Sequence, residues 1–408
     1  MNHFIKKMII IPLIFFVTSL GNDAFRPFLP LYFLSLGGSP EMVGLVFSIS
    51  GVIATLALIP SGYLADKYGR RKMLLSALIF ALLSSIIFLS ATNYLFVILG
   101  MLTFSIAGAI AGPAALAMIS ELTPEKKRGE AFGTMDAIIL LGSAGAPLIG
   151  GCFVSVYGFR AVFYWSTLTS LIAFSIAQLH LKETARDIDK KNKGDDKSFY
   201  KSVLAELANS YLRPVSLLKE TFALMTILFI SIVLIGEKMI EPYVSLYAVD
   251  VAQIPIEELG VLFSFLSILT AAVSYIGGRM ADVIGINRVI VLSIIGSFFI
   301  AVFIPIYPYA FILLLPLLIL FSNIRTPSIN AFLTNLTDHK ERATMVGATY
   351  GLGTIAGVFI GPLLGASLYG LSPPFLFYMF ASLQFINIFL VFLLLFKIKT
   401  MKPKAERI

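Results

Sequence analysis

Six charged side chains inside long apolar runs are the residues most able to do chemistry in this 408-residue chain. A charge at the centre of a lipid bilayer costs about 2.5–3.5 kcal/mol on insertion scales, so such residues seldom persist unpaired. Equal numbers of the two signs permit full mutual neutralisation. The side chains could pair with one another, carry a proton on a carboxylate, or bind a charged solute. They are Asp23, Glu237, Glu241, Arg26, Lys238 and Arg325.

Four of these charges fall at a recurring helical spacing. Asp23 and Arg26 are three residues apart and would share one face of a helix. Lys238 and Glu241 repeat that spacing with the signs reversed. A proline follows each pair, and proline frees the carbonyl four residues before it, here that of Asp23 or Lys238. Each pair would therefore lie beside backbone acceptors that need a partner.

Composition places the chain in a membrane. Hydrophobic residues make up 58% of it, charged residues only 13%, and the mean hydropathy is +0.91. Soluble domains are about 45–50% apolar and about 25% charged. The net charge of +8 lies in short segments between apolar runs, whereas a nucleic-acid surface would gather it on one face. We therefore expect no nucleic-acid partner. One cysteine and three histidines offer no metal or cofactor site.

Twelve apolar runs are long enough to cross a bilayer, which takes about 20 residues. A polar linker, 182–219, would separate an N-terminal six-helix bundle, 1–181, from a C-terminal bundle with its tail, 220–408. We expect a short surface helix near 199–212 in the linker. The predicted spans are 8–36, 41–65, 72–91, 94–120, 130–157, 161–181, 222–248, 257–281, 288–306, 309–335, 342–369 and 374–396.

The positive charges predict an orientation, because lysine and arginine mark the cytoplasmic side of membrane proteins. Of the 31 lysines and arginines, 27 fall on one side of the predicted spans. Only Arg160 falls on the other side, and the remaining three lie inside spans. We expect a multi-pass protein of the cell membrane with both termini in the cytoplasm.

An internal repeat supports the two bundles. The sequence of Gly62–Lys72 recurs, with several residues changed, as Gly278–Arg288, at an offset of a little over half the chain. Gly21–Pro27 matches Gly236–Pro242 at almost the same offset. A near-constant offset through five helices indicates a membrane unit duplicated in tandem, which is how many secondary transporters are built.

The repeated loop motif resembles that of the major facilitator superfamily. The resemblance covers essentially the whole chain and implies an all-α fold of two six-helix bundles related by a pseudo-twofold axis. It also implies that Asp66 contacts the N-terminal end of helix eleven, where unpaired amides favour an anion. The two arginines would pair with nearby carboxylates or with lipid phosphates. The motif residues are Gly62, Asp66, Gly69, Arg70 and Arg71, with Asp282 in the second copy.

A second motif, on helix five, is similar to that of proton-coupled antiporters, chiefly drug exporters. Ala146 replaces one glycine of the family pattern. Small residues let helices pack closely in lipid, and the resemblance implies that the proline bend seals the pathway against ion leak. The motif comprises Gly142, Pro147, Gly150 and Gly151, and helix eleven repeats it with Gly357, Gly361 and Pro362.

One feature of these antiporters is missing. Many carry a basic residue within helix four, and helix four has none here. Arg325, on helix ten, lies at the repeat-equivalent of Ala111 and could substitute for the missing base.

Several roles for the intramembrane charges remain open. In bundles related by an axis along the membrane normal, matched positions face one another across the pathway. Asp23 would then oppose Lys238, and Arg26 would oppose Glu241. The charges could form an outer gate, or one carboxylate could carry the coupling proton, with Glu237 the first choice and Asp23 the second. The bases could instead bind an anionic substrate, or the charges could pair statically and only fix helix packing.

We predict proton-coupled efflux of amphipathic or drug-like small molecules by alternating access, carried out by a monomer surrounded by membrane lipids. A carrier of an anionic metabolite is the alternative. A signalling receptor on a transporter fold would add soluble domains, for which we see no room. No nucleophile–base constellation, histidine or cysteine cluster, or phosphate loop in the spans indicates an enzyme.

Overall fold

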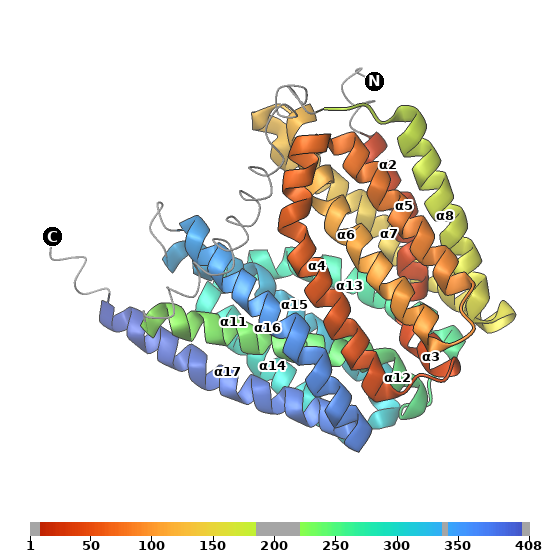
Figure 1. The fold of residues 1–408 in the computed structure, drawn as a ribbon. Helices are drawn as coiled ribbons and strands as arrows, with labels where there is room; N and C mark the ends of the chain where they lie inside the picture. Colours follow the sequence, from red (N-terminus) through yellow and green to blue (C-terminus); the bar gives the residue numbers. More distant parts are fainter. Residues whose placement is uncertain (1–8, 185–220, 337–341, 402–408) are drawn as a thin grey trace. The chain divides into compact units, whose positions relative to one another are not determined.

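The computed structural model of the protein describes residues 9–184, 221–336 and 342–401, and every regular element in these ranges is a helix (Figure 1). The elements of the first half are α2 (Ile10–Phe25), η1 (Arg26–Phe28), α3 (Leu29–Ser35), α4 (Pro40–Tyr68), α5 (Arg70–Leu89), α6 (Tyr94–Leu122), η2 (Glu125–Lys127), α7 (Arg128–Tyr157) and α8 (Phe159–His180).

The second half repeats this order of α-helices, with a 3-10 turn after its first helix as well; its other 3-10 turn comes one helix earlier than η2 does. Beyond residue 184, the predicted linker 182–219 and its surface helix near 199–212 lie outside the described residues. The elements of the second half are α11 (Thr221–Ile240), η4 (Glu241–Tyr243), α12 (Val244–Asp250), α13 (Ile256–Ile284), α14 (Ile286–Ile306), η5 (Pro308–Ala310), α15 (Phe311–Leu336), α16 (Arg342–Leu371) and α17 (Pro373–Met401).

The first and seventh spans are each interrupted by a turn of 3-10 helix, whereas the sequence predicts one continuous helix at each place. The interruptions are η1 and η4, and Pro27 and Pro242 lie at their centres. Proline lacks a backbone donor and its ring clashes with the preceding turn, so the α-helix gives way there. Ten other described helices are long and apolar enough to cross a membrane. With the two interrupted spans they make the twelve predicted crossings.

The same packing pattern occurs in both halves (Figure 1). In the first, α2 packs against α7 and α8, and α5 packs against α6 and α8. In the second, α11 packs against α16 and α17, and α14 packs against α15 and α17. Gly69 and Gly285 precede the matched helices α5 and α14 with φ of +99° and +93°, a region that favours glycine. The duplication seen in the sequence therefore extends to three dimensions.

The chain forms two compact units that follow the two halves except in two short segments. The start of α4 belongs to the second unit, and the start of α13 belongs to the first. The domain boundaries predicted at 181 and 220 stay predictions. The first unit comprises Met1–Ser39, Ile49–Leu207 and Ile254–Ser267, and the second comprises Pro40–Ser48, Ala208–Gln253 and Ile268–Ile408.

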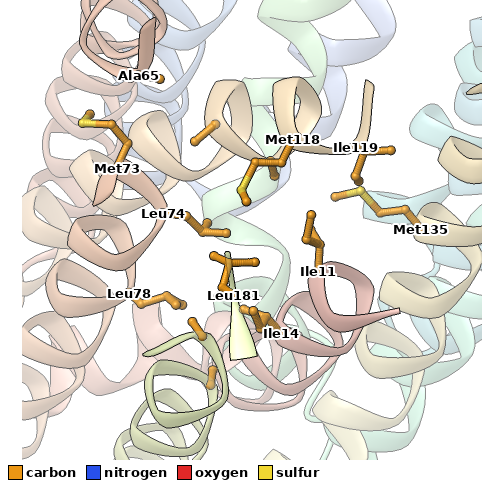
Figure 2. Packing of buried hydrophobic residues seen from close by; sticks show 14 of the residues in the cluster. Ile11, Ile14, Ala65, Met73, Leu74, Leu78, Met118, Ile119, Met135 and Leu181 are labelled. Atoms are coloured by element: carbon orange, nitrogen blue, oxygen red, sulfur yellow. The ribbon is translucent and has the colours of Figure 1, made fainter. Parts of the chain in front are cut away.

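A buried apolar cluster lies at the end of the first unit that carries the loop motif (Figure 2). Side chains from α2 and from α4 to α8 meet in it, so the helix ends around the motif are fixed by close packing. The cluster includes Ile11, Ile14, Leu74, Leu78, Met118, Met135 and Leu181.

Glycines of the helix-five motif let α7 approach the backbone of α2. A side chain at Gly150 would collide with the carbonyl oxygen of Ala24. A Cβ at Gly142 would lie only 2.9 Å from the carbonyl oxygen of Phe16. Such contacts are possible only where no side chain separates the two backbones.

Helix α16 approaches α11 in the same manner. A Cβ at Gly357 would lie 2.7 Å from the Cβ of Leu234, and one at Gly361 would lie 2.8 Å from the carbonyl oxygen of Ile235. The close packing predicted for the motif is therefore confirmed in both halves. The predicted seal against ion leak stays a prediction.

Replacing Gly150 with alanine is expected to destabilise the protein, because the added Cβ overpacks the α2–α7 contact at a cost of about 1–3 kcal/mol. Gly145→Ala on the same helix is the matched control, since a Cβ there meets nothing within 4 Å. Thermal melting in detergent should place Gly150→Ala below the unsubstituted protein. Gly145→Ala should melt at or slightly above it, because alanine favours helix. Equal melting of the two variants would contradict the packing role.

Candidate functional site

The second half holds an ion pair between a buried Arg325 and a partly exposed Glu237. An Nη2 of Arg325 on α15 lies 2.5 Å from Oε1 of Glu237 on α11. The Nη1 of the same guanidinium donates to Oε1 of Gln384 on α17 at 3.2 Å. The Arg325 side chain is 1% exposed, whereas that of Glu237 is 35% exposed. The guanidinium therefore links three helices, and the carboxylate is the member of the pair that a proton can reach.

Several buried polar atoms around this pair lack a hydrogen-bond partner among the described residues. Nε of Arg325 and Oγ of Ser328 are two, one helical turn apart on α15. The Nε2 of Gln384 and both amide atoms of Asn387 are the others, one turn apart on α17. Buried polar atoms in this condition require water or a polar ligand, because an unsatisfied group costs about 1–3 kcal/mol. The ion pair thus lies in a polar patch inside an otherwise apolar bundle.

The other intramembrane charges have partners close by in the chain or in the fold. Nζ of Lys238 lies 2.6 Å from Oε2 of Glu241, as their three-residue spacing allows. Oδ2 of Asp23 accepts a hydrogen bond from the Oγ of Ser143 on α7 at 2.6 Å. Arg26 begins η1. The predicted meeting of Asp23 with Lys238, and of Arg26 with Glu241, across the pathway stays a prediction.

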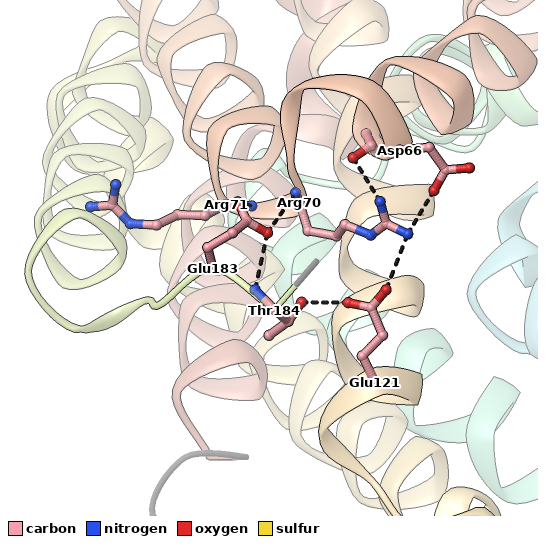
Figure 3. A network of polar contacts seen from close by, with 7 residues as sticks. Asp66, Arg70, Arg71, Glu121, Glu183 and Thr184 are labelled. Atoms are coloured by element: carbon pink, nitrogen blue, oxygen red, sulfur yellow. Dashed lines mark hydrogen bonds and ion pairs between the residues drawn. The ribbon is translucent and has the colours of Figure 1, made fainter. Parts of the chain in front are cut away.

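The loop motif forms a network at one end of the first unit (Figure 3). Nη2 of Arg70 lies 2.6 Å from a carboxylate oxygen of Asp66 and 3.1 Å from one of Glu121 on α6. Its Nη1 donates to the carbonyl oxygen of Ala65. The predicted pairing of Arg70 with nearby carboxylates is therefore confirmed. The contact of Asp66 with the start of helix eleven stays a prediction.

The second arginine of the motif binds differently. Arg71 donates from Nε to the carbonyl oxygen of Leu181 at 2.7 Å and from Nη2 to that of Gln178 at 2.9 Å. These are terminal carbonyls of α8, which lack helical partners and attract a cation. Arg71 therefore fixes the end of α8 to the start of α5, an arrangement that we did not predict.

Glu183 and Thr184 extend the network from the start of the linker (Figure 3). The two carboxylate oxygens of Glu183 accept the backbone N–H groups of Arg70 and Arg71, each at 3.0 Å. The hydroxyl of Thr184 donates to Glu121 at 2.6 Å. No side chain of α5 itself caps that helix, so Glu183 supplies the acceptor that its first amides need.

The remaining motif residues occupy simpler positions. A Cβ at Gly62 would meet nothing within 4 Å, so space does not require glycine there. Asp282, the second-copy equivalent of Asp66, is exposed near the end of α13.

Helix α13 docks on the proline of the helix-five motif. A Cβ at Gly260 would lie 2.7 Å from the carbonyl oxygen of Pro147, and one at Gly151 would lie 2.8 Å from the Cα of Gly260. The backbone N–H of Leu148 donates to the Oγ of Ser264 at 2.9 Å. Proline disturbs the helical ladder beside it, and Ser264 provides an acceptor for the neighbouring amide.

The repeat-equivalent contact occurs between α4 and α16 in the second unit. Gly44 lies against the carbonyl oxygen of Pro362. The Oγ of Ser48 donates to the carbonyl oxygen of Phe359 at 2.9 Å. Gly44 and Ser48 precede Gly260 and Ser264 by one shared offset, that of the loop motif. The spacing of the repeat therefore contains a signal that could have identified this contact.

Sequence reasoning also missed residues that the site uses. Gln384 and Asn387 are amides three residues apart in an apolar run, and that spacing could have revealed them. The fifth span also holds Asp136, an exposed acid on α7 that is not part of this site. Glu183 lies in a polar segment without periodicity, and nothing in the sequence marks its contact with α5.

Comparison with known proteins identifies the family. Residues 12–324 and 235–407 match the Major Facilitator Superfamily. The chain belongs to this superfamily. It is therefore a multi-pass membrane protein and a secondary transporter, and not an enzyme.

Two relatives in the superfamily are drug-resistance proteins. The multidrug resistance protein MdtG of Serratia proteamaculans is 31% identical over 296 residues, which are 69% of this chain and 67% of that protein. The multi-drug resistance efflux pump PmrA of Streptococcus pneumoniae is 25% identical over 374 residues, 87% of each chain. The predicted similarity to multidrug efflux proteins is thereby confirmed.

A solved structure supports the fold. A bacterial homologue of the human lysosomal transporter Spinster, in an inward-facing and unoccupied conformation, matches with a TM-score of 0.75. The match covers 97% of each chain at 14% sequence identity. At that identity the likeness concerns the fold alone, and it confirms the major facilitator fold.

Replacing Glu183 with alanine is expected to destabilise the first unit, because the first amides of α5 lose their acceptor, at a cost of about 1 kcal/mol. The melting temperature in detergent should fall by about 2–4 °C. Glu125→Ala, an exposed acid between α6 and α7, is the matched control and should leave melting unchanged. An unchanged melting temperature for Glu183→Ala would show that the cap carries no stability.

Proposed function

We propose that the protein exports amphipathic or drug-like compounds by alternating access, driven by inward proton flow. The pair formed by Arg325 and Glu237 is the observation that carries the proposal. Similarity to proteins named for multidrug resistance and efflux supports the substrate class. We further propose that the protein works as a monomer in the cell membrane, with both termini in the cytoplasm, as the charge distribution predicts.

Glu237 is the proposed proton carrier. In the described state its carboxylate lies 2.5 Å from the Arg325 guanidinium. Protonating Glu237 here would leave a buried guanidinium uncompensated, and breaking such a pair costs about 3–5 kcal/mol. The carboxylate therefore binds a proton after it has moved away from Arg325, so proton binding is tied to a change of conformation.

Polar groups around Arg325 make this exchange possible. When Glu237 leaves, Gln384 still accepts from the guanidinium, and Ser328 and Asn387 offer further polar atoms in the same patch. Water held by these atoms would solvate the charge and give protons a route to the carboxylate. If these residues were apolar, no group could take the place of Glu237 beside Arg325, and the ion pair would not open.

Two structural devices support a rocking motion in this proposal. The network of Asp66, Arg70 and Glu121 stabilises one end of the first half, and a contact from Asp66 to helix eleven would bias the two states. The helix segments around Pro147 and Pro362, each packed against a glycine and a serine of a neighbouring helix, would seal the pathway against ions.

The alternative, a carrier of an anionic metabolite, needs bases that are available to the solute. Arg325 and Lys238 each have a carboxylate partner already, at 2.5 Å and 2.6 Å. An anion would have to displace that carboxylate. The geometry therefore favours proton exchange at Glu237 over anion binding.

Glu237→Gln is expected to abolish gradient-driven efflux, because an amide pairs with the guanidinium weakly and cannot carry a proton. Dye efflux from energised cells, with and without a protonophore, measures this. The unsubstituted protein should lose export when the gradient collapses, and Glu237→Gln should export no more than cells lacking the protein. Its exchange of labelled for unlabelled dye should persist without a gradient.

Glu258→Gln provides the matched control, since Glu258 is an exposed acid in the first turn of α13. It should export normally. Protonophore-sensitive efflux that continues in Glu237→Gln would remove Glu237 as the carrier. Efflux that is indifferent to the protonophore in the unsubstituted protein would overturn proton coupling itself.

A further inference from the structure

A cleft opens inside the first unit between α2, α5 and α6. Its volume is about 180 Å³. Its walls are mostly small or apolar, and a Cβ built on Gly108 would meet nothing within 4 Å, so the space is open at that point. Residues that define it include Thr18, Asn22, Asp23, Phe104, Gly108 and Ala111.

The internal repeat relates this cleft to the ion pair of the second half. Asn22 corresponds to Glu237 in the repeat, and Ala111 corresponds to Arg325. In the second half the long Arg325 side chain reaches from α15 to Glu237 on α11. In the first half Ala111 ends in a methyl group, and both it and Asn22 line the open cleft.

The cleft has acceptors and no base. Asp23 is the one ionisable group among its lining residues. Within the described part of the chain its carboxylate receives a hydrogen bond from Ser143, and Oδ1 of Asn22 has no partner. A carboxylate and a free amide oxygen in an apolar wall together favour a positively charged group.

We infer that the cleft binds an organic cation, whose positive group lies by Asn22 and Asp23 in the place that the Arg325 guanidinium fills in the second half. The inference rests on the proposed export function and names the class of compound exported. The aromatic rings of Phe15 and Phe104 in the wall also suit a cation. The cleft holds the charged head, while a larger apolar body would extend beyond it.

Calorimetric titration of the full chain in lipid nanodiscs tests this directly. The probes are phenyltrimethylammonium and its neutral isostere tert-butylbenzene, which share a shape and differ in charge. The unsubstituted protein should bind the cation more tightly than the isostere. Asp23→Asn should weaken cation binding by about 10-fold or more, as expected for loss of a charged contact. Binding of the isostere should not change.

Three further variants make the test specific. Asp23→Glu should restore most of the cation affinity. Ala111→Arg copies the second half into the first, so its guanidinium should occupy the cleft and abolish cation binding. Asp136→Asn removes an acid that is exposed on α7 and does not line the cleft, so it should bind the cation normally. Melting temperatures identify any variant that fails to fold.

Unchanged cation binding in Asp23→Asn would overturn the inference, and so would loss of binding in Asp136→Asn. Because binding is measured without a gradient, the outcome is separate from the proton coupling of the proposed function. If dye efflux is sensitive to the protonophore but Asp23→Asn leaves cation binding unchanged, the cation site is ruled out and proton coupling is kept. If cation binding depends on Asp23 but efflux does not respond to the protonophore, proton coupling is ruled out and the cation site is kept.

Discussion

A guanidinium buried inside a membrane must keep a compensating group beside it, and this requirement governs the second half of the protein. Arg325 has almost no exposed surface, and it joins α15 to α11 through Glu237 and to α17 through Gln384. Removing a charge from water costs several kcal/mol per ion even after the surroundings relax. The three helices are therefore held together until another group, or water, takes the place of the carboxylate.

The two halves share one arrangement of helices and differ in the side chains at equivalent positions. The glycines of α7 let α2 pack closely against it, and the glycines of α16 do the same for α11. A turn of 3-10 helix follows α2 and another follows α11. On that common frame the second half carries Arg325 and Glu237, while the first carries Ala111 and Asn22. In this account the position in the second half is occupied by the guanidinium of Arg325, and the equivalent cleft in the first half is open to a cationic solute. Coupling and substrate recognition can then lie in different halves.

Features set by local spacing could be predicted from the sequence. The twelve crossings follow from the length of the apolar runs, and close packing at Gly142 and Gly361 follows from small residues one helical turn apart. The pairing of Lys238 with Glu241 likewise needs only a three-residue spacing. The interruption of the first span was missed, although Pro27 marks it, because tertiary packing decides whether a proline kinks a helix or ends it.

The partner of Arg325 could not be predicted, because it depends on how α11 and α15 rotate about their axes. Several acids were available in the apolar runs, and only the placed helices show that Glu237 is the one beside Arg325. The cap that Glu183 places on α5 depends in the same way on where the chain turns after α8. Residues of this kind become visible only once the helices are placed.

The central claim is that Arg325 and Glu237 stabilise the second half only as a pair, and a double-mutant cycle on thermal melting tests it most directly. Arg325→Leu, Glu237→Leu and the double variant would be melted beside the unsubstituted protein in the same detergent. The account predicts that the double variant melts above either single variant, because each single change leaves one charge uncompensated. If the two destabilisations simply add, the pair is not the constraint described here.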